Sequence, residues 1–298
     1  MSRIDKMKKR LIKVLSVTAA LILSVCTASC SSYLNGDTAE TAAVTEAETV
    51  AVVQTQAAAE TQAPPTEPPE TQAPTEYTFR WERSDPYDPY DATGFVSVGD
   101  VIPDAIMDIR YYSEYNFVGS RIDGYEEPIA LLSEEAAYAL KNAADELRDE
   151  GYRLIIYDAY RPRSAVDHFV SWASDSSDTK MKEVFYPDID KSLLFDYGYI
   201  AYYSGHSRGS KVDMSLADID TGEPVDMGGG FDYFSTVSHP DYTGVSEEQY
   251  RNRMTLRNAM LNNGFSPCAT EWWDFTLNNE PYPSTYFNFP VSSSSLVY

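Results

Sequence analysis

Cysteine, histidine and basic residues are scarce in this chain. Its 298 residues include three cysteines and three histidines, and 23 lysines and arginines stand against 46 acidic residues, for a formal net charge of −23. Cys26 and Cys30 lie near the N-terminus, so Cys268 is the only cysteine in the rest of the chain and no internal disulfide framework is expected. The acidic balance argues against nucleic acid as a partner, because a phosphate backbone is bound through Lys and Arg.

A basic segment followed by an apolar one opens the chain. "MSRIDKMKKR" precedes "LIKVLSVTAALILSV", and small residues follow in "CTASCSS". This order predicts a secretory signal over residues 1–30 that is too short to be a lasting membrane span. Ala28 and Ser29 before Cys30 resemble a bacterial lipoprotein cleavage box, which would lipidate Cys30 and anchor the protein to the outer face of the cell membrane. Ordinary cleavage without a lipid is the alternative, since Thr27 stands where leucine is commoner.

Residues 31–76 have almost no aromatic side chains. Their composition is mainly Thr, Ala, Glu, Pro and Gln, as in "AAAETQAPPTEPPETQAPTE". Such a segment cannot bury enough apolar surface to offset the entropy of ordering it. We therefore predict a disordered spacer, which its prolines keep extended.

Residues 77–298 are rich in Tyr, Phe and Trp and are predicted to form one α+β domain, with a central, mainly antiparallel sheet flanked by helices. Helical spacing of apolar residues predicts a helix over 134–150, capped by Ser133 and stopped by Gly151. Similar signals predict helices over 161–173, with Pro162 in the first turn, and over 247–263 after Ser246. The run "YRLIIYDAY" reads as a buried strand.

A second strand follows the glycine- and serine-rich turn "SGHSRGS". In "KVDMSLAD", Val212, Met214 and Leu216 alternate with Asp213 and Ser215, which is the period of a strand with two different faces. His206 in the turn and Asp213 on the strand are spaced as two metal ligands could be.

Other candidate groups are as weak alone as His206 and Asp213. "TEWWDF" adds Glu271 and Asp274, and "YDAYRP" offers Asp158 and Arg161, which could be an ordinary ion pair at the corner between a strand and a helix. A histidine in a turn or an acidic residue beside an aromatic one is structural more often than functional. The order of the motifs along the chain therefore matters more than any one of them.

That order resembles the bacterial D-alanyl-D-alanine dipeptidases, the zinc enzymes linked to vancomycin resistance and to turnover of cell-wall dipeptides. The resemblance is carried by "YDAYRP", then "SGHSRGSKVDMSL", then "EWWDF". The flanking segments "DIRYYSEYNFVGSRIDGYE", "DTGEPVDMGGGFDYFSTVSH" and "TLNNEPYPSTYFNFPV" extend it over residues 92–292. Several ordered motifs across one domain make this resemblance specific.

The resemblance implies a role for each matching position. His206 and Asp213 match zinc ligands, Glu271 matches the catalytic general base, and Arg161 matches the arginine that stabilises charge on the scissile carbonyl. Asp232 matches the carboxylate that binds the ammonium group of the substrate. Tyr125 and Ser204 match positions that line the dipeptide pocket.

Two positions depart from the family pattern. Asp274 stands where the third zinc ligand of the family, the histidine of "EWWH", is expected. An aspartate can bind zinc, but an oxygen-rich set also favours manganese or iron and leaves the metal with less net positive charge. Gly205 stands where the family commonly has a serine, which puts one substrate contact in doubt.

Three functions are compatible with these residues. The first is metal-dependent hydrolysis of D-Ala-D-Ala or related cell-wall dipeptides, with Glu271 as the general base. Asp274 motivates the second, a catalytically impaired protein that binds cell-wall peptides. The third is a D,D- or L,D-carboxypeptidase acting on muropeptides, against which Asp232 argues because its carboxylate would face a neutral amide.

Overall fold

The computed structural model describes residues 88–296, so the predicted signal, the lipidation site at Cys30 and the spacer lie outside the described residues. The elements are β1 (Phe95–Ser97), α2 (Val98–Val101), β2 (Ile106–Met107), β3 (Leu131–Ser133), α3 (Glu134–Glu150), β4 (Tyr152–Asp158), α4 (Arg163–Ser174), α5 (Lys182–Phe185), β5 (Lys211–Asp218), α6 (Glu247–Asn262), β6 (Phe265–Pro267) and β7 (Asp274–Leu277). A short 3-10 helix, η2 (Gly205–Arg208), precedes β5.

A five-stranded sheet forms the centre of the domain, with strands in the order β2-β4-β5-β7-β6. Only β2 pairs in parallel, with β4, while the β4–β5, β5–β7 and β6–β7 pairs are antiparallel. A two-stranded sheet of β1 and β3 lies apart from it. The expected α+β fold with a mainly antiparallel sheet is confirmed.

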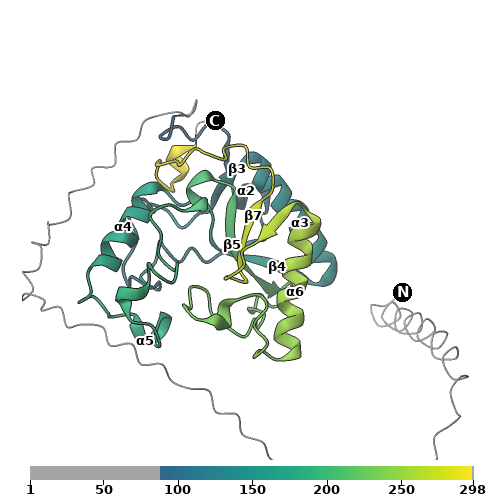
Figure 1. The fold of residues 1–298 in the computed structure, drawn as a ribbon. Helices are drawn as coiled ribbons and strands as arrows, with labels where there is room; N and C mark the ends of the chain where they lie inside the picture. Colours follow the sequence, from purple (N-terminus) through teal and green to yellow (C-terminus); the bar gives the residue numbers. More distant parts are fainter. Residues whose placement is uncertain (1–87, 297–298) are drawn as a thin grey trace, which may run out of the picture. The chain divides into compact units, whose positions relative to one another are not determined.

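Helices α3 and α6 lie side by side next to the sheet (Figure 1). Helix α3 has the predicted bounds and ends because Gly151 adopts φ 97°, a left-handed conformation that glycine adopts without strain. Helix α6 begins with a complete capping box between Ser246 and Gln249. At the far ends of both helices, the carboxylate of Glu146 accepts hydrogen bonds from Asn262 and Asn263.

Two details of the helix starts differ from the prediction. Ser133 is the N-cap residue of α3, as expected, but its side chain makes no capping hydrogen bond, and its hydroxyl is hydrogen-bonded to the hydroxyl of Ser210 at 3.0 Å. Pro162 is not in the first turn of α4 but precedes it as the N-cap residue, with extended backbone. The contact between Ser133 and Ser210 connects the start of α3 to the segment before β5, where functional candidates lie.

The two faces of β5 differ as the alternating pattern predicted. Val212, Met214 and Leu216 are fully buried in the apolar core. Asp213 and Ser215 point to the opposite face, where buried polar residues are collected. In residues 88–296 no helix combines the length and the apolar character that crossing a membrane requires.

Candidate active site

Three aspartates lie next to one another across the central strands. Asp213 of β5 is directly opposite Asp158 of β4 on one side and Asp274 of β7 on the other. Ile156 pairs with Met214, so regular pairing would place Tyr157 opposite Asp213. A bulge between Ile156 and Asp158 brings Asp158 to that position instead. All three carboxylates are buried.

His206 approaches these carboxylates from the turn before β5. Ser204 begins η2 by accepting a hydrogen bond from the backbone N–H of His206, which fixes the start of the turn. Ring nitrogen Nδ1 lies 2.8 Å from the carbonyl oxygen of Ala159. Since a carbonyl only accepts, Nδ1 carries the hydrogen and Nε2, 3.4 Å from Asp213 Oδ2, presents its lone pair. Burial and the nearby Arg161 lower the pKa of His206 to about 3, so the ring is neutral.

The side chains that could bind a metal form two clusters of three residues each. One ligand atom from each of Asp158, His206 and Asp213 lies within 4.8 Å of the others. The same holds for Cys268, Glu271 and Asp274. Among the described residues, the predicted ligands His206, Asp213 and Asp274 are therefore divided between two adjacent clusters.

The donor atoms fit a divalent metal such as zinc. Oδ1 of Asp213 is buried and accepts no hydrogen bond, and Oδ1 of Asp274 is in the same condition. A buried carboxylate oxygen without a donor is costly unless a cation meets it. Together with the free Nε2 of His206, these oxygens supply the neutral imidazole and carboxylates that zinc accepts.

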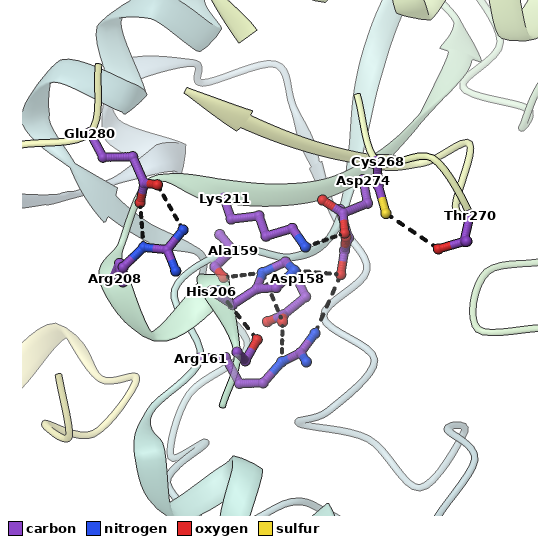
Figure 2. A network of polar contacts seen from close by, with 12 residues as sticks. Asp158, Ala159, Arg161, His206, Arg208, Lys211, Cys268, Thr270, Asp274 and Glu280 are labelled. Atoms are coloured by element: carbon purple, nitrogen blue, oxygen red, sulfur yellow. Dashed lines mark hydrogen bonds and ion pairs between the residues drawn. The ribbon is translucent and has the colours of Figure 1, made fainter. Parts of the chain in front are cut away.

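Lys211 forms an ion pair with the predicted third ligand, Asp274. Its Nζ lies 2.5 Å from Asp274 Oδ2 (Figure 2), although neither oxygen of Asp274 makes a hydrogen bond of good geometry. Burial disfavours the charge of Lys211, but the carboxylates of Asp274, Glu271 and Asp213 outweigh burial and raise its pKa. Lys211 therefore keeps its positive charge inside the site.

Arg161 is held in place by two carboxylates and two aromatic rings. Its Nε donates to Asp158 Oδ2 at 2.8 Å, and Nη2 lies 3.4 Å from Asp213 Oδ2. The guanidinium stacks over the rings of Tyr111 and Phe169, with Cζ 4.8 and 5.3 Å from their centroids. This fixes a positive charge at the wall of the cavity.

Tyr125 is placed differently from the prediction. It does not line the cavity, because it is buried behind Asp158 and donates its hydroxyl to Asp158 Oδ1 at 2.5 Å. One carboxylate oxygen of Asp158 thus accepts a hydrogen bond from Tyr125, and the other accepts one from Arg161. The side chain of Tyr125 orients the arginine through Asp158 and does not touch what enters the cavity.

Asp232 is the only non-glycine residue in the described part of the chain with positive φ, at 57°. This conformation turns its buried carboxyl group toward the cavity, where Oδ2 accepts a hydrogen bond from the hydroxyl of Tyr111 at 2.8 Å. Burial and the neighbouring Asp213 raise the pKa of Asp232 to about 8. A positively charged ligand group would stabilise the ionised form.

A cavity of about 170 Å³ joins these groups. Its polar lining consists mainly of Arg161, Ser204, His206, Lys211, Asp213, Asp232, Glu271 and Asp274, and its apolar lining includes Phe117, Val166, Phe169 and Phe234. Glu271 is half-buried, and burial together with Asp274 and Asp213 raises its pKa. A carboxylate with a raised pKa is suited to exchange protons near neutral pH.

The residues predicted for the site did not include Lys211 and Tyr111, and Asp158 was expected only as a partner in an ion pair. Asp158 and Arg161 form the expected ion pair, but the central position of Asp158 depends on the bulge in β4. The alternation of β5 places Lys211 on the face of Asp213, a signal that could have found it. Nothing in "DIRYYSEY" distinguishes Tyr111 from its neighbours.

Comparison with known proteins identifies the family. Residues 91–292 match the family model for D-ala-D-ala dipeptidases. D-alanyl-D-alanine dipeptidases from Enterococcus faecalis and Enterococcus faecium are 41% and 39% identical over 199 and 198 residues, covering 67% and 66% of this chain and 98% of each relative. A similar enzyme from Streptomyces coelicolor is 39% identical over 66% of this chain and 98% of its own length.

One solved structure is also similar, at a level too low to support any inference. It is a variant of the vancomycin resistance D,D-pentapeptidase VanY in complex with Zn(II), with a TM-score of 0.32, 13% identity, and coverage of 53% of this chain and 78% of that one. The chain belongs to the D-Ala-D-Ala dipeptidase family of metallopeptidases.

Proposed function

We propose that this protein hydrolyses D-Ala-D-Ala, or a related cell-wall dipeptide, with a divalent metal held by His206, Asp213 and Asp274. The observation that carries the proposal is the cavity. Its volume of about 170 Å³ is smaller than the roughly 300 Å³ at which pockets for drug-sized ligands begin. Metal-ligating groups and Asp232 both face into it, so one small substrate can meet all of them.

Each remaining residue has a task that its surroundings support. A bound divalent metal supplies Lewis acidity and makes water a nucleophile at neutral pH. Glu271 accepts the proton of the attacking water and returns it to the leaving amine. Arg161, already fixed by Asp158, meets the negative charge that develops on the scissile carbonyl oxygen.

Asp232 selects for a substrate with a free amino end. In the metal-free protein without substrate, the raised pKa of Asp232 favours the protonated acid at neutral pH. A substrate ammonium group replaces that proton as the neutralising charge, whereas the neutral amide of a longer peptide cannot. This preference supports a dipeptidase over a carboxypeptidase that acts on acylated peptides.

The test measures D-alanine release from D-Ala-D-Ala by the purified, zinc-loaded full chain and its Glu271→Gln variant. Removing a general base lowers kcat by about 10²- to 10⁴-fold, while the amide side chain leaves the ligands His206 and Asp213 intact. Glu248→Gln, an exposed position at the start of α6, is the matched control and keeps full activity. A Glu271→Gln variant as active as the wild type would contradict the assignment.

The ion pair between Lys211 and Asp274 favours a second candidate, a cell-wall peptide-binding protein without turnover. Calorimetric binding of D-Ala-D-Ala, combined with no release of D-alanine in zinc, manganese or iron, would support this candidate. Equal activity on N-acetyl-D-Ala-D-Ala would instead favour the carboxypeptidase.

We also propose that the enzyme works outside the cytoplasm, anchored through a lipid on Cys30. The segment of residues 1–30 supports this, and such a location suits turnover of wall fragments or scavenging of dipeptides. Cys30→Ser should move the protein from the membrane fraction to the soluble extracytoplasmic fraction. An unchanged distribution would contradict the anchor.

A further inference from the structure

We infer that Lys211 is a positioning residue of the metal centre. It holds the ligand Asp274 in place, and its charge restores the net positive charge that the centre loses where aspartate replaces a histidine ligand. The inference rests on the proposed metal-dependent function and assigns it one more residue. It starts from the ion pair between Lys211 Nζ and Asp274 Oδ2 at 2.5 Å.

The register of the sheet explains why these two side chains meet. Asp213 is directly opposite Asp274, and Lys211 lies two residues earlier on the same face of β5. A long side chain reaches a diagonal neighbour on the adjacent strand. Lys211 therefore reaches Asp274 across the strands, as Figure 2 shows.

The charges of the site account for the pairing. One aspartate and two neutral histidines around a divalent ion leave one positive charge. With Asp274 in place of a histidine, two aspartates and His206 leave none. The ammonium group of Lys211, which is paired with Asp274, returns the total to one. A centre that keeps its positive charge remains an effective Lewis acid.

The pairing also leaves an oxygen of Asp274 available. Lys211 meets Oδ2, while Oδ1 is buried and accepts no hydrogen bond. The aspartate can therefore offer one oxygen to a metal and the other to the lysine. Such a shared carboxylate is held in one orientation, as ligands are when a neighbouring group bonds to their second donor atom.

Gly205 provides the space that Lys211 occupies. A Cβ atom at position 205 would lie 3.1 Å from Cδ of Lys211 and 3.3 Å from Nη2 of Arg208. The serine expected there from the family pattern would press on the stem of the lysine. Lys211 thus lies next to both positions that depart from the family pattern: its stem packs against Gly205 and its ammonium group pairs with Asp274.

The test compares metal affinity with turnover in Lys211→Met, which keeps most of the stem and removes the charge. Zinc and cobalt affinities are measured by titrating the metal-free full chain, with cobalt absorption reporting the ligand environment. We expect metal affinity to rise about tenfold or more, because losing a charge that repels the metal outweighs losing the support of Asp274. We expect kcat on D-Ala-D-Ala to fall about tenfold, because the metal is more neutralised.

The control is the same substitution at a buried lysine outside the site. Lys191 is 3% exposed, donates to the carbonyl oxygens of Asp175 and Asp178, and does not line the cavity. Lys191→Met should lower stability and leave metal affinity unchanged. Lys211→Arg, which keeps the charge, should return both affinity and kcat toward the wild-type values.

Opposite movement of the two quantities supports the inference, and every other result overturns it. A lysine with a merely structural role would lower both metal affinity and kcat in Lys211→Met. A lysine that merely occupies the place of the metal would, when removed, raise both. The metal titration needs no substrate, so unchanged or weaker binding overturns the inference even if the wild type hydrolyses no dipeptide.

Discussion

Replacing Asp232 by asparagine should change how the stability of the metal-free protein depends on pH. Asp232 is 8% exposed, its carboxyl group accepts a hydrogen bond from Tyr111, and the pKa of that group is raised from 3.8 to about 8 by burial and by Asp213. Below pH 4 both the folded and the unfolded chain carry this proton. Between about pH 4 and pH 8 the unfolded chain loses it first, so the folded state becomes less stable as pH rises.

The size of the effect follows from the shift. One unit of pKa difference corresponds to about 1.4 kcal/mol, so the change from 3.8 to about 8 corresponds to roughly 5–6 kcal/mol of unfolding free energy lost across this window. Asparagine keeps a group that can accept a hydrogen bond from Tyr111 and carries no proton to lose. The variant should therefore lose much less stability between pH 5 and pH 8.

Urea unfolding of the chelator-treated chain at pH 5, 6, 7 and 8 measures this difference. Asp213 and Glu271 also have raised pKa values and keep part of the dependence in the variant. The exposed Asp241, changed to asparagine, is the control and should follow the wild type. Parallel stability curves for Asp232→Asn and the wild type over this range would show that Asp232 does not cause the dependence.

Two further substitutions test the supports of the site. Tyr125→Phe removes a buried hydrogen bond to the carboxylate of Asp158, which should lower the unfolding free energy in urea by about 1.5–3 kcal/mol. The control is Tyr138→Phe at an exposed position, which should leave the unfolding free energy unchanged. A loss of similar size in the control would contradict the prediction for Tyr125. Arg253→Met should lower the unfolding free energy by about 3 kcal/mol or more. The buried guanidinium of Arg253 donates hydrogen bonds to the carbonyl oxygens of three residues in the loop around Asp232. The exposed Arg251→Met is its control, and equal unfolding midpoints would show that those carbonyls need no donor.

The sequence was informative wherever a local pattern decides the structure. The stop of α3 at Gly151 follows from glycine at a left-handed position, and the faces of β5 follow from the alternation of its residues. The start of α6 at Ser246 follows from hydrogen bonds within one turn. None of these depends on residues far away in the chain.

Features that depend on distant partners were not predictable in this way. The hydroxyl of Ser133 has a helix N–H and Ser210 as possible partners, and only the packed structure shows that Ser210 is bonded. Tyr125 and Asp158 are 33 residues apart, so the sequence alone gave no reason to place the tyrosine behind the aspartate. The family pattern supplied candidate ligands, but their division into two clusters results from how β5 and β7 meet.

The bulge in β4 also makes the site depend on how the backbone pairs. In regular pairing without the bulge, the same residues would place Tyr157 opposite Asp213 and turn Asp158 to the opposite face. Arg161 would then lose its partner although every functional residue was still encoded. In this short segment the pairing of the backbone is as much a functional property as the identity of the residues.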